Sequence, residues 1–269
     1  MVDALFESLG DDRFQPTELS RGPWSPDALH GGPVAALLAG AGEAALDGAA
    51  PDAPPLHRAR LTIDIERPVP LDVLRVRATV VRPGRKVRVA EVELFDDSGR
   101  RLARATLLGI RQEQLDLPTE RFAPADPPPP RRDAAGDPEM WLPHPLTAFH
   151  KDAVDHRFVL GGILQLGPAQ DWIRLRVPVV AGVDPSPLQR VAAAADFGNG
   201  LSAVLPQDAW VFINPDLTIT LQRAAVGEWV ALDAVTRIEP AGVGTAESDL
   251  FDDAGRIGQS VQTLLVEAR

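Results

Sequence analysis

The sequence has no cysteine and no tyrosine, and Lys86 and Lys151 are its only lysines. The lack of cysteine excludes disulfides, thiolate metal sites and a cysteine nucleophile, and it fits a reducing compartment. No stretch approaches the roughly 18 apolar residues that a membrane-spanning helix needs. The N-terminus also lacks the basic start and apolar core of a signal peptide. We therefore expect a cytoplasmic protein that does not insert into a membrane.

Basic residues are outnumbered, with 27 Lys and Arg against 38 Asp and Glu and a formal net charge of -11. So acidic a surface repels a phosphate backbone, which argues against a nucleic-acid partner. The length of 269 residues and the 45% hydrophobic content suit one large or two small globular domains.

Several familiar chemical motifs are also absent. The sequence contains no G-x-S-x-G nucleophile turn, no H-E-x-x-H zinc motif and no phosphate-binding P-loop. No two of the five histidines are four residues apart, so a zinc site is not expected. Gly40-Ala41-Gly42 resembles the start of a dinucleotide fingerprint, but no strand precedes it, and close helix packing is the better interpretation.

The chain does contain an internal repeat. Residues 61–110 align without gaps with residues 217–266, at an offset of 156, and 15 of these 50 positions are identical. The clearest match is between Leu94–Arg100 and Leu250–Arg256. Such self-similarity predicts two copies of one fold.

Each copy is predicted to be an antiparallel sheet with one helix. Alternating apolar and polar residues over 61–66 and 74–80 are typical of half-buried strands. Segments 96–99 and 252–255 resemble hairpin turns. A largely apolar, and so buried, helix is expected after His30-Gly31-Gly32. A second is expected from an N-cap at Ser186 to about Asp196.

A proline-rich segment separates the two copies. Seven prolines occur in the 21 residues from Pro118 to Pro138, and this composition favours an extended linker over a packed core. We therefore expect an N-terminal unit over 1–116, a linker over 117–140 and a C-terminal unit over 141–269.

Three short motifs resemble the double-hotdog acyl-CoA thioesterases of the type II (TesB-like) family. They are Leu29–Gly32 at the first helix start, Asp171–Arg174 followed by the helix ending in Ala195–Asn199, and Ser260–Gln262 in the last strand. The order and spacing of the motifs agree with the duplication. The resemblance implies an α+β fold in which two tandem units each wrap an antiparallel sheet around a central helix.

The resemblance also implies a site that hydrolyses an acyl-CoA with an activated water and no covalent intermediate. Such a site requires neither a metal nor a bound organic cofactor. In that family the catalytic Asp falls on Asp196 and the catalytic Gln on Gln262. The third polar position, usually Thr or Ser, falls on Asn214, with Thr218 as a fallback. Asp196 would accept the water's proton or orient the water. Gln262 and Asn214 would hydrogen-bond to the water's other hydrogen and its remaining lone pair, which holds the water in one orientation.

Other residues have binding or structural interpretations. Backbone N–H groups at Gly31 and Gly32 could stabilise the developing oxyanion, and His30 could act as a helix cap or a general acid. Arg67 and Arg223 recur at matched positions, which favours a structural role, although either could contact the phosphates of CoA.

The repeat suggests one active site per chain. Gln262 falls on Thr106 and Asn214 on Arg58, while a rough helix alignment puts Asp196 over Gly42. Two alternatives to a thioesterase stay open: a non-catalytic acyl-CoA binding module, and a hotdog hydratase or dehydratase. The hydratase is disfavoured because no histidine closely follows Asp196. Homodimerisation is a further expectation from the resemblance.

Overall fold

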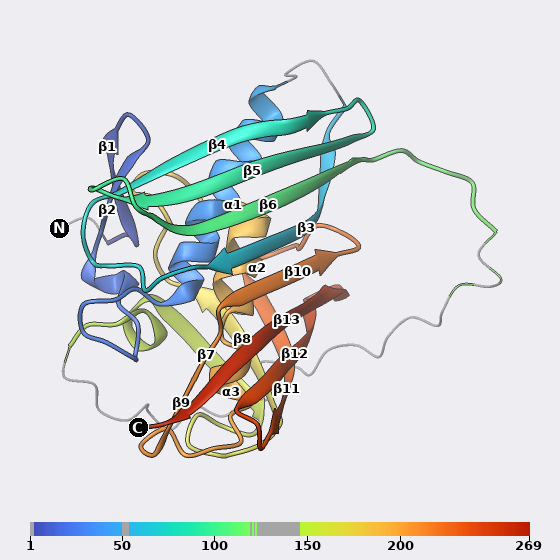
Figure 1. The fold of residues 1–269 in the computed structure, drawn as a ribbon. Coiled ribbons are helices and arrows are strands. Elements are labelled where there is room, and N and C mark those ends of the chain that lie inside the picture. The colour runs from blue at the N-terminus through green and yellow to red at the C-terminus, as the bar shows by residue number, and fades with distance from the viewer. Residues whose placement is uncertain (1–2, 50–53, 119, 121, 123–145) are drawn as a thin grey trace.

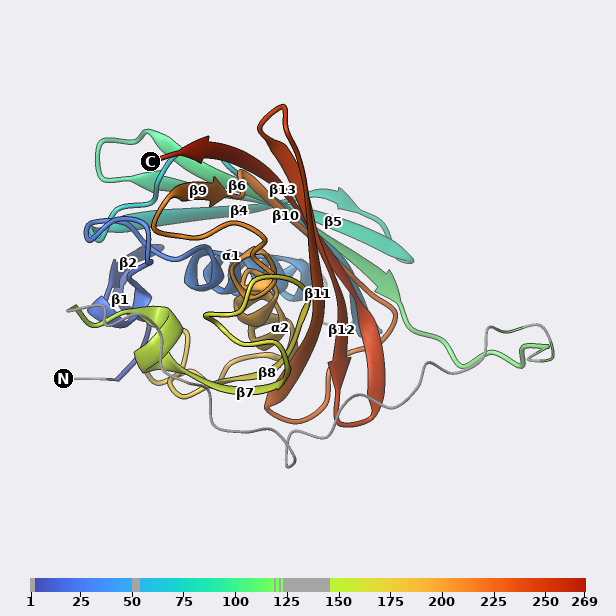
Figure 2. The ribbon, with the colours of Figure 1, turned by 90° about the horizontal axis from the view of Figure 1, so that it is seen from below.

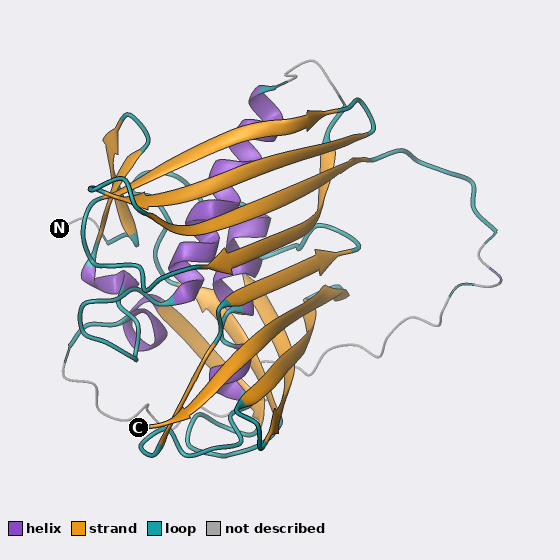
Figure 3. Ribbon diagram, viewed as in Figure 1, coloured by secondary structure: helices purple, strands orange, loops and turns teal. Residues whose placement is uncertain are grey.

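The computed structural model describes residues 3–49, 54–118, 120, 122 and 146–269. One antiparallel sheet of 13 strands curves around two helices, α1 (Gly31–Gly48) and α2 (Pro187–Ala195) (Figures 1 and 2). Figure 3 shows the helices on the concave side of the strands. This α+β arrangement is the predicted architecture.

The strands of the N-terminal half are β1 (Phe6–Gly10), β2 (Arg13–Pro16), β3 (Leu56–Ile65), β4 (Leu74–Pro83), β5 (Val87–Asp96) and β6 (Arg101–Arg111). Those of the C-terminal half are β7 (Val154–Leu160), β8 (Ala169–Leu175), β9 (Trp210–Ile213), β10 (Asp216–Leu221), β11 (Trp229–Glu239), β12 (Val243–Asp252) and β13 (Gly255–Ala268). Shorter elements are a 3-10 turn at Glu18–Ser20, a π-helical turn at Phe149–Ala153 and α3 (Gly198–Leu201). The strand order is β1-β2-β4-β5-β6-β3-β10-β13-β12-β11-β8-β7, with β9 paired to β13.

The two halves are related by an approximate two-fold axis through the centre of the sheet. There β3 and β10 pair antiparallel, and Thr62 lies opposite Thr218, its own counterpart in the repeat. Read outward from this pair, β6, β5 and β4 on one side correspond to β13, β12 and β11 on the other. The repeated residues therefore occupy positions that this pseudo-symmetry makes equivalent.

Helix α1 is buried because most of its surface is apolar. Val34, Leu37, Leu38 and Leu46 are each at most 3% exposed, and burying such a side chain contributes roughly 1.5–3 kcal/mol. The helix lies under β4, β5 and β6 and against α2. Gly42 faces the sheet, where a Cβ would lie 3.0 Å from the Leu107 side chain, so it allows the close packing predicted for this segment.

Helix α2 begins as predicted. The Ser186 hydroxyl accepts a hydrogen bond from the Gln189 backbone N–H at 3.1 Å, and the Gln189 side chain accepts one from the Ser186 N–H at 3.0 Å. This capping box satisfies donors that a helix start leaves without partners. The Gln189 side chain also donates to the α1 carbonyl of Ala36 at 3.2 Å, which joins the two helices.

The predicted turns connect β5 to β6 and β12 to β13. Gly99 and Gly255 have φ values of +81° and +117°, which glycine adopts without a steric penalty. The proline-rich segment over 117–140 lies mostly outside the described residues. No helix in the part of the chain that is described is long and apolar enough to cross a membrane.

Candidate active site

Asp196 lies where the end of α2 meets the start of α1. It is the C-cap residue of α2 and is 5% exposed. A Cβ on Gly31, the first residue of α1, would lie 2.6 Å from both carboxylate oxygens of Asp196. Only glycine leaves room for the carboxylate there. The N-terminus of α1, which carries partial positive charge, therefore lies directly against this carboxylate.

Two side-chain amides hold this carboxylate from the sheet side. The Asn214 amide donates to Asp196 Oδ1 at 3.0 Å, and the Gln262 amide donates to the same atom at 3.4 Å and to the Asp196 carbonyl at 3.2 Å. The Gln262 amide oxygen accepts the Asn199 backbone N–H at 3.1 Å. A Cβ on Gly198 would lie 2.9 Å from that oxygen. The structure thus brings Asp196, Asn214 and Gln262 together, as predicted.

Gln262 has a different position from the expected one, however. It is 1% exposed, both of its amide hydrogens go to Asp196, and it does not line the adjoining cavity. The Gln262 amide thus contacts the Asp196 carboxylate and not the cavity in which a water would bind.

Asn214 is better placed to contact a water. Its second amide hydrogen goes to the Asp216 carbonyl at 3.2 Å, and the residue lines the cavity. Its amide oxygen has no hydrogen-bond partner among the described residues, so it can accept a hydrogen from a water. Thr218 lies further along β10, opposite Thr62 and Val261, and does not line the cavity. The fallback residue is therefore not part of this cluster.

His30 contacts both the start of α1 and the Asp196 carboxylate. It is the N-cap of α1, and its Nδ1 lies 3.0 Å from the Gly32 backbone nitrogen and 2.9 Å from Asp196 Oδ2. A neutral Nδ1 can accept the Gly32 N–H, or a protonated Nδ1 can donate to the carboxylate, but it cannot do both. His30 and Asp196 therefore form a pair that can share one proton.

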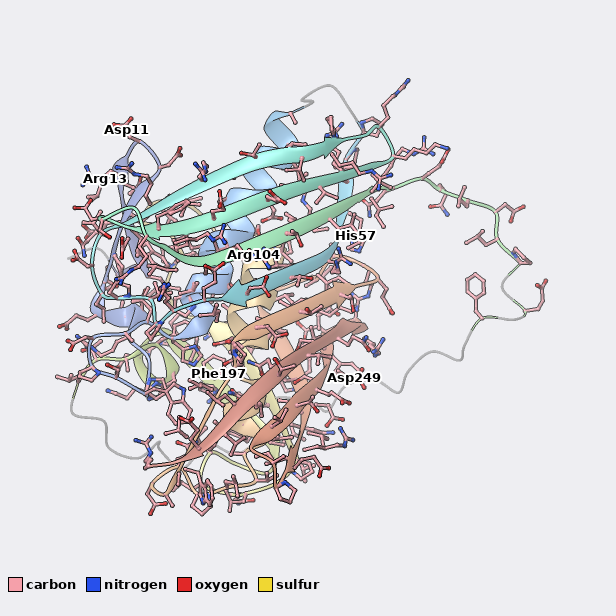
Figure 4. All side chains as sticks on the ribbon, in the orientation of Figure 1. Asp11, Arg13, His57, Arg104, Phe197 and Asp249 are labelled. Atoms are coloured by element: carbon pink, nitrogen blue, oxygen red, sulfur yellow. The ribbon has the colours of Figure 1, made fainter. Side chains whose placement is uncertain are left out.

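Aromatic rings fix the orientation of His30. The ring centroids of Phe149 and Phe197 lie 5.0 and 4.8 Å from that of His30 (Phe197 is labelled in Figure 4). The other side of Phe197 contacts His156, whose Nδ1 lies 2.5 Å from Asp171 Oδ2. Burial raises the pKa of Asp171. The Asp171 motif thus has a supporting role behind the site.

A cavity of about 400 Å³ opens beside the carboxylate. Its polar lining includes His30, Gly31, Asp196, Asn199 and Asn214. Its apolar lining includes Trp24, Leu29, Val34, Ile65, Val69, Ile213 and Leu265. Trp24 also lines a second cavity, of about 410 Å³, formed with Ile163, Leu164, Leu166 and Ala203. An apolar group can thus lie beside the buried Asp196 carboxylate in the first cavity.

The other end of the helix pair lacks this arrangement. The helix starts Gly31 and Pro187 differ by 156, so the counterpart of Asp196 is Gly40, two residues from the rough alignment at Gly42. A Cβ on Gly40 would lie 2.5 Å from Gln189 Nε2, so the Gln189 side chain fills the space.

A different acid, Glu43, lies at this second helix start. It accepts the Ser186 hydroxyl at 2.5 Å and lies 3.6 Å from the Arg58 guanidinium. Burial raises the pKa of Glu43 despite these partners. Arg58 is the repeat counterpart of Asn214. The full Asp-Asn-Gln set is therefore present in one copy, as the repeat suggested. In the described part of the chain, no group of three His, Cys, Asp or Glu side chains could hold a metal ion.

Comparison with known proteins gives two family matches. A model of acyl-CoA thioesterase N-terminal domains matches residues 20–109, and one of acyl-CoA thioesterase C-terminal domains matches residues 118–266. None of the curated proteins matches the chain.

Solved structures of similar fold include three that align over almost the whole chain. A candidate thioesterase from Novosphingobium aromaticivorans is 23% identical, with a TM-score of 0.71 over 97% of this chain and 98% of the other. A hot dog fold protein from Alicyclobacillus acidocaldarius is 17% identical, with a TM-score of 0.69 over 97% and 96%. An acyl-CoA thioesterase II from Mycobacterium marinum is 16% identical, with a TM-score of 0.61 over 98% and 96%. At these identities the likeness establishes the hot dog fold alone.

Proposed function

Because the chain belongs to the acyl-CoA thioesterase family, we propose that it hydrolyses an acyl-CoA to a carboxylic acid and CoA, with Asp196 activating the water. The observation that carries the proposal is the buried Asp196 carboxylate, held by Asn214 and Gln262 at the wall of a cavity. A base that is fixed in this way removes much of the orientational cost of the reaction.

The reaction requires a base, a nucleophilic water and donors for an oxyanion. A water held by Asp196 and by the Asn214 amide oxygen attacks the thioester carbonyl carbon, and its proton passes to Asp196. The oxyanion accepts a hydrogen bond from the backbone N–H of Gly31, a residue that lines the cavity. This N–H lies at a helix start and has no partner among the described residues. The C–S bond then breaks, and the thiolate leaves with the proton that Asp196 received.

His30 contributes a route for that proton. The transferred proton can move from Asp196 Oδ2 to His30 Nδ1, 2.9 Å away. While Nδ1 carries the proton it no longer accepts the Gly32 N–H, and the proton returns through Asp196 to the departing thiolate. Gly32 itself is buried and does not line the cavity, so Gly31 is the oxyanion donor of this proposal.

The first test is thiol release from a panel of acyl-CoAs of different length and branching, measured with a thiol-reactive dye. The protein has no cysteine, so it adds no background signal. Asp196→Asn should lower kcat by at least about 10²-fold, the typical contribution of a positioned base. Glu43→Gln is the matched control, because Glu43 is the carboxylate at the other helix start, and it should retain turnover.

Absence of turnover would point to the binding module. If no member of the panel releases thiol while CoA esters still bind, the hydrolase proposal fails. If Asp196→Asn retains wild-type turnover, the proposed base is wrong even though hydrolysis occurs.

A hydratase is the second candidate, and the His30–Asp196 pair favours it. The sequence argument against this activity was that no histidine follows Asp196, yet the structure places His30 beside Asp196 from another helix. A hydratase would add water across the double bond of a 2-enoyl-CoA, the proton going to C2 and the hydroxyl to C3. Loss of the enoyl absorbance without thiol release would identify it, whereas thiol release from the same substrate supports hydrolysis.

A further inference from the structure

Arg67 lies at the exposed rim of the cavity that contains Asp196. It follows the end of β3, is exposed, and is the only arginine or lysine among the residues that line the cavity. Asp196, at the inner wall, is only 5% exposed. The cavity therefore runs from an exposed rim, where Arg67 stands beside Glu66, to a buried carboxylate.

The repeat shows what an arginine at this position otherwise does. Arg223, the counterpart of Arg67, forms a two-pronged ion pair with Asp252 at 2.6 and 2.5 Å and also donates to the Gly255 carbonyl at 2.9 Å. The Asp252 side chain is fully buried. In the C-terminal copy this arginine is thus fixed within the fold.

In the N-terminal copy, the corresponding acid is already bound by other groups. Asp96, the counterpart of Asp252, accepts the Ser98 hydroxyl at 2.6 Å, the Arg100 backbone N–H at 2.9 Å and the Arg100 side chain at 3.1 Å. These contacts lower the pKa of Asp96 to about 2. Position 254 holds Ala where the first copy has Ser98, so the same hydroxyl contact cannot form with Asp252.

The acid next to Arg67 in the sequence is paired as well. Glu66 accepts the Arg101 guanidinium at 3.0 and 2.9 Å. The Arg67 backbone N–H donates to the Leu102 carbonyl at 3.1 Å, but the Arg67 side chain has no hydrogen-bond or ion-pair partner among the described residues. The chain has a net charge of -11, and an unpaired guanidinium at the rim of a cavity can bind an anionic group of the substrate.

We propose that Arg67 binds a phosphate group of the CoA moiety while the thioester reaches Asp196. This inference rests on the proposed function and assigns one residue of its substrate recognition. Phosphates remain hydrated because burying their charge is costly, so they fit an exposed rim better than a buried wall. The uncharged pantetheine arm would then occupy the cavity, whose lining is mostly apolar.

The kinetic test compares two thioesters with the same acyl group, one on CoA and one on N-acetylcysteamine, which has no phosphate. Arg67→Gln should raise KM for the CoA thioester about tenfold, the effect of losing one charge-assisted contact in a solvated position. It should leave kcat, and kcat/KM for the N-acetylcysteamine thioester, unchanged. Arg67→Lys should restore part of the loss, because it keeps the charge but not the two-pronged geometry.

Arg104→Gln is the matched control. Arg104 is an exposed arginine of the same half (labelled in Figure 4) that pairs with Asp64 at 2.8 Å. It does not line the cavity, so its loss should affect neither substrate. Equal effects of Arg67→Gln and Arg104→Gln on the CoA thioester would show a general charge effect and overturn the proposal.

A binding measurement separates this inference from the proposed function. Isothermal titration calorimetry with CoA, dephospho-CoA and pantetheine needs no turnover. Arg67→Gln should weaken binding of CoA about tenfold and leave pantetheine binding unchanged. If the wild type binds CoA but hydrolyses nothing, the proposed function fails while this test still applies. If Arg67→Gln binds CoA as the wild type does, or selectively loses thioesters whose acyl group carries a carboxylate, the assignment to phosphate is wrong.

Discussion

Gly31→Ala is the substitution with the sharpest expected effect on the candidate site. The added Cβ would lie 2.6 Å from both Asp196 carboxylate oxygens, where ordinary contact begins at 3.4 Å. The carboxylate must therefore move by about 0.8 Å, but the amides of Asn214 and Gln262 hold it from the other side. A misplacement of about 1 Å can cost ~10² in rate. We expect kcat/KM to fall about 10²-fold.

The fold should tolerate the same substitution. Alanine is favoured over glycine in a helix by up to ~1 kcal/mol, which offsets part of the local strain. Gly48→Ala is the matched control at the other end of α1, where no atom lies within 4 Å of the new Cβ. We expect that variant to keep full activity and to raise Tm slightly. Thiol release and thermal unfolding, followed on both variants, provide the measurements.

One result would refute the reasoning. If Gly31→Ala is folded and hydrolyses acyl-CoA at the wild-type rate, the position of Asp196 against the start of α1 is not required for catalysis. A loss of activity together with unfolding would instead be resolved by Asp196→Asn, which adds no volume at this contact.

Three further predictions concern stability and specificity. Asp252→Ala should lower the free energy of unfolding, measured by urea titration, by about 2–4 kcal/mol. The substitution leaves the partly exposed Arg223 and two backbone N–H groups without their acceptor. Asp96→Ala, in the exposed counterpart turn, should lower it much less. Burial raises the pKa of Glu43, so the folded protein holds this proton more tightly than the unfolded chain, and stability is lost as pH rises above about 4.5. The Tm of Glu43→Gln minus the Tm of the wild type should therefore become more positive from pH 4 to pH 7. A constant difference would contradict this. Trp24→Ala should join the two cavities that Trp24 lines, and under the proposed thioesterase activity it should shift the preferred acyl chain toward greater length. An unchanged chain-length profile would show that the second cavity does not receive the acyl group.

Local patterns in the sequence were sufficient for most of the secondary structure. The alternation over 61–66 and 74–80 predicted β3 and β4, and the capping residues His30 and Ser186 marked both helix starts. These features depend on neighbours a few residues away. The repeat extended them to the pseudo-symmetry, because two copies with the same strands pair through the same edge. The hotdog architecture followed from this pattern and from the family resemblance.

The three polar residues that the sequence named for the site lie together, but the sequence did not predict their contacts. Asp196, Asn214 and Gln262 were named from short motifs, and they do converge. The sequence could not indicate that Gln262 faces Asp196 and not the cavity, since a strand residue's surroundings depend on what packs above it. A rough helix alignment also missed Gly40 as the counterpart of Asp196, because helices of different length share a reference point only at their first residue.

The sequence by itself determined where strands, turns and helix starts lie, and which copy contains the acid and its two amides. Only the tertiary structure decided that His30 lies against Asp196, 166 residues later in the chain. It also decided that the Arg67 side chain has no partner in the described part of the chain, whereas the Arg223 side chain pairs with Asp252. The physical reason is that local propensity acts through neighbours in the chain. A shared proton or an ion pair instead depends on angstrom-scale distances between segments, and those distances are set by how two helices and a curved sheet pack together.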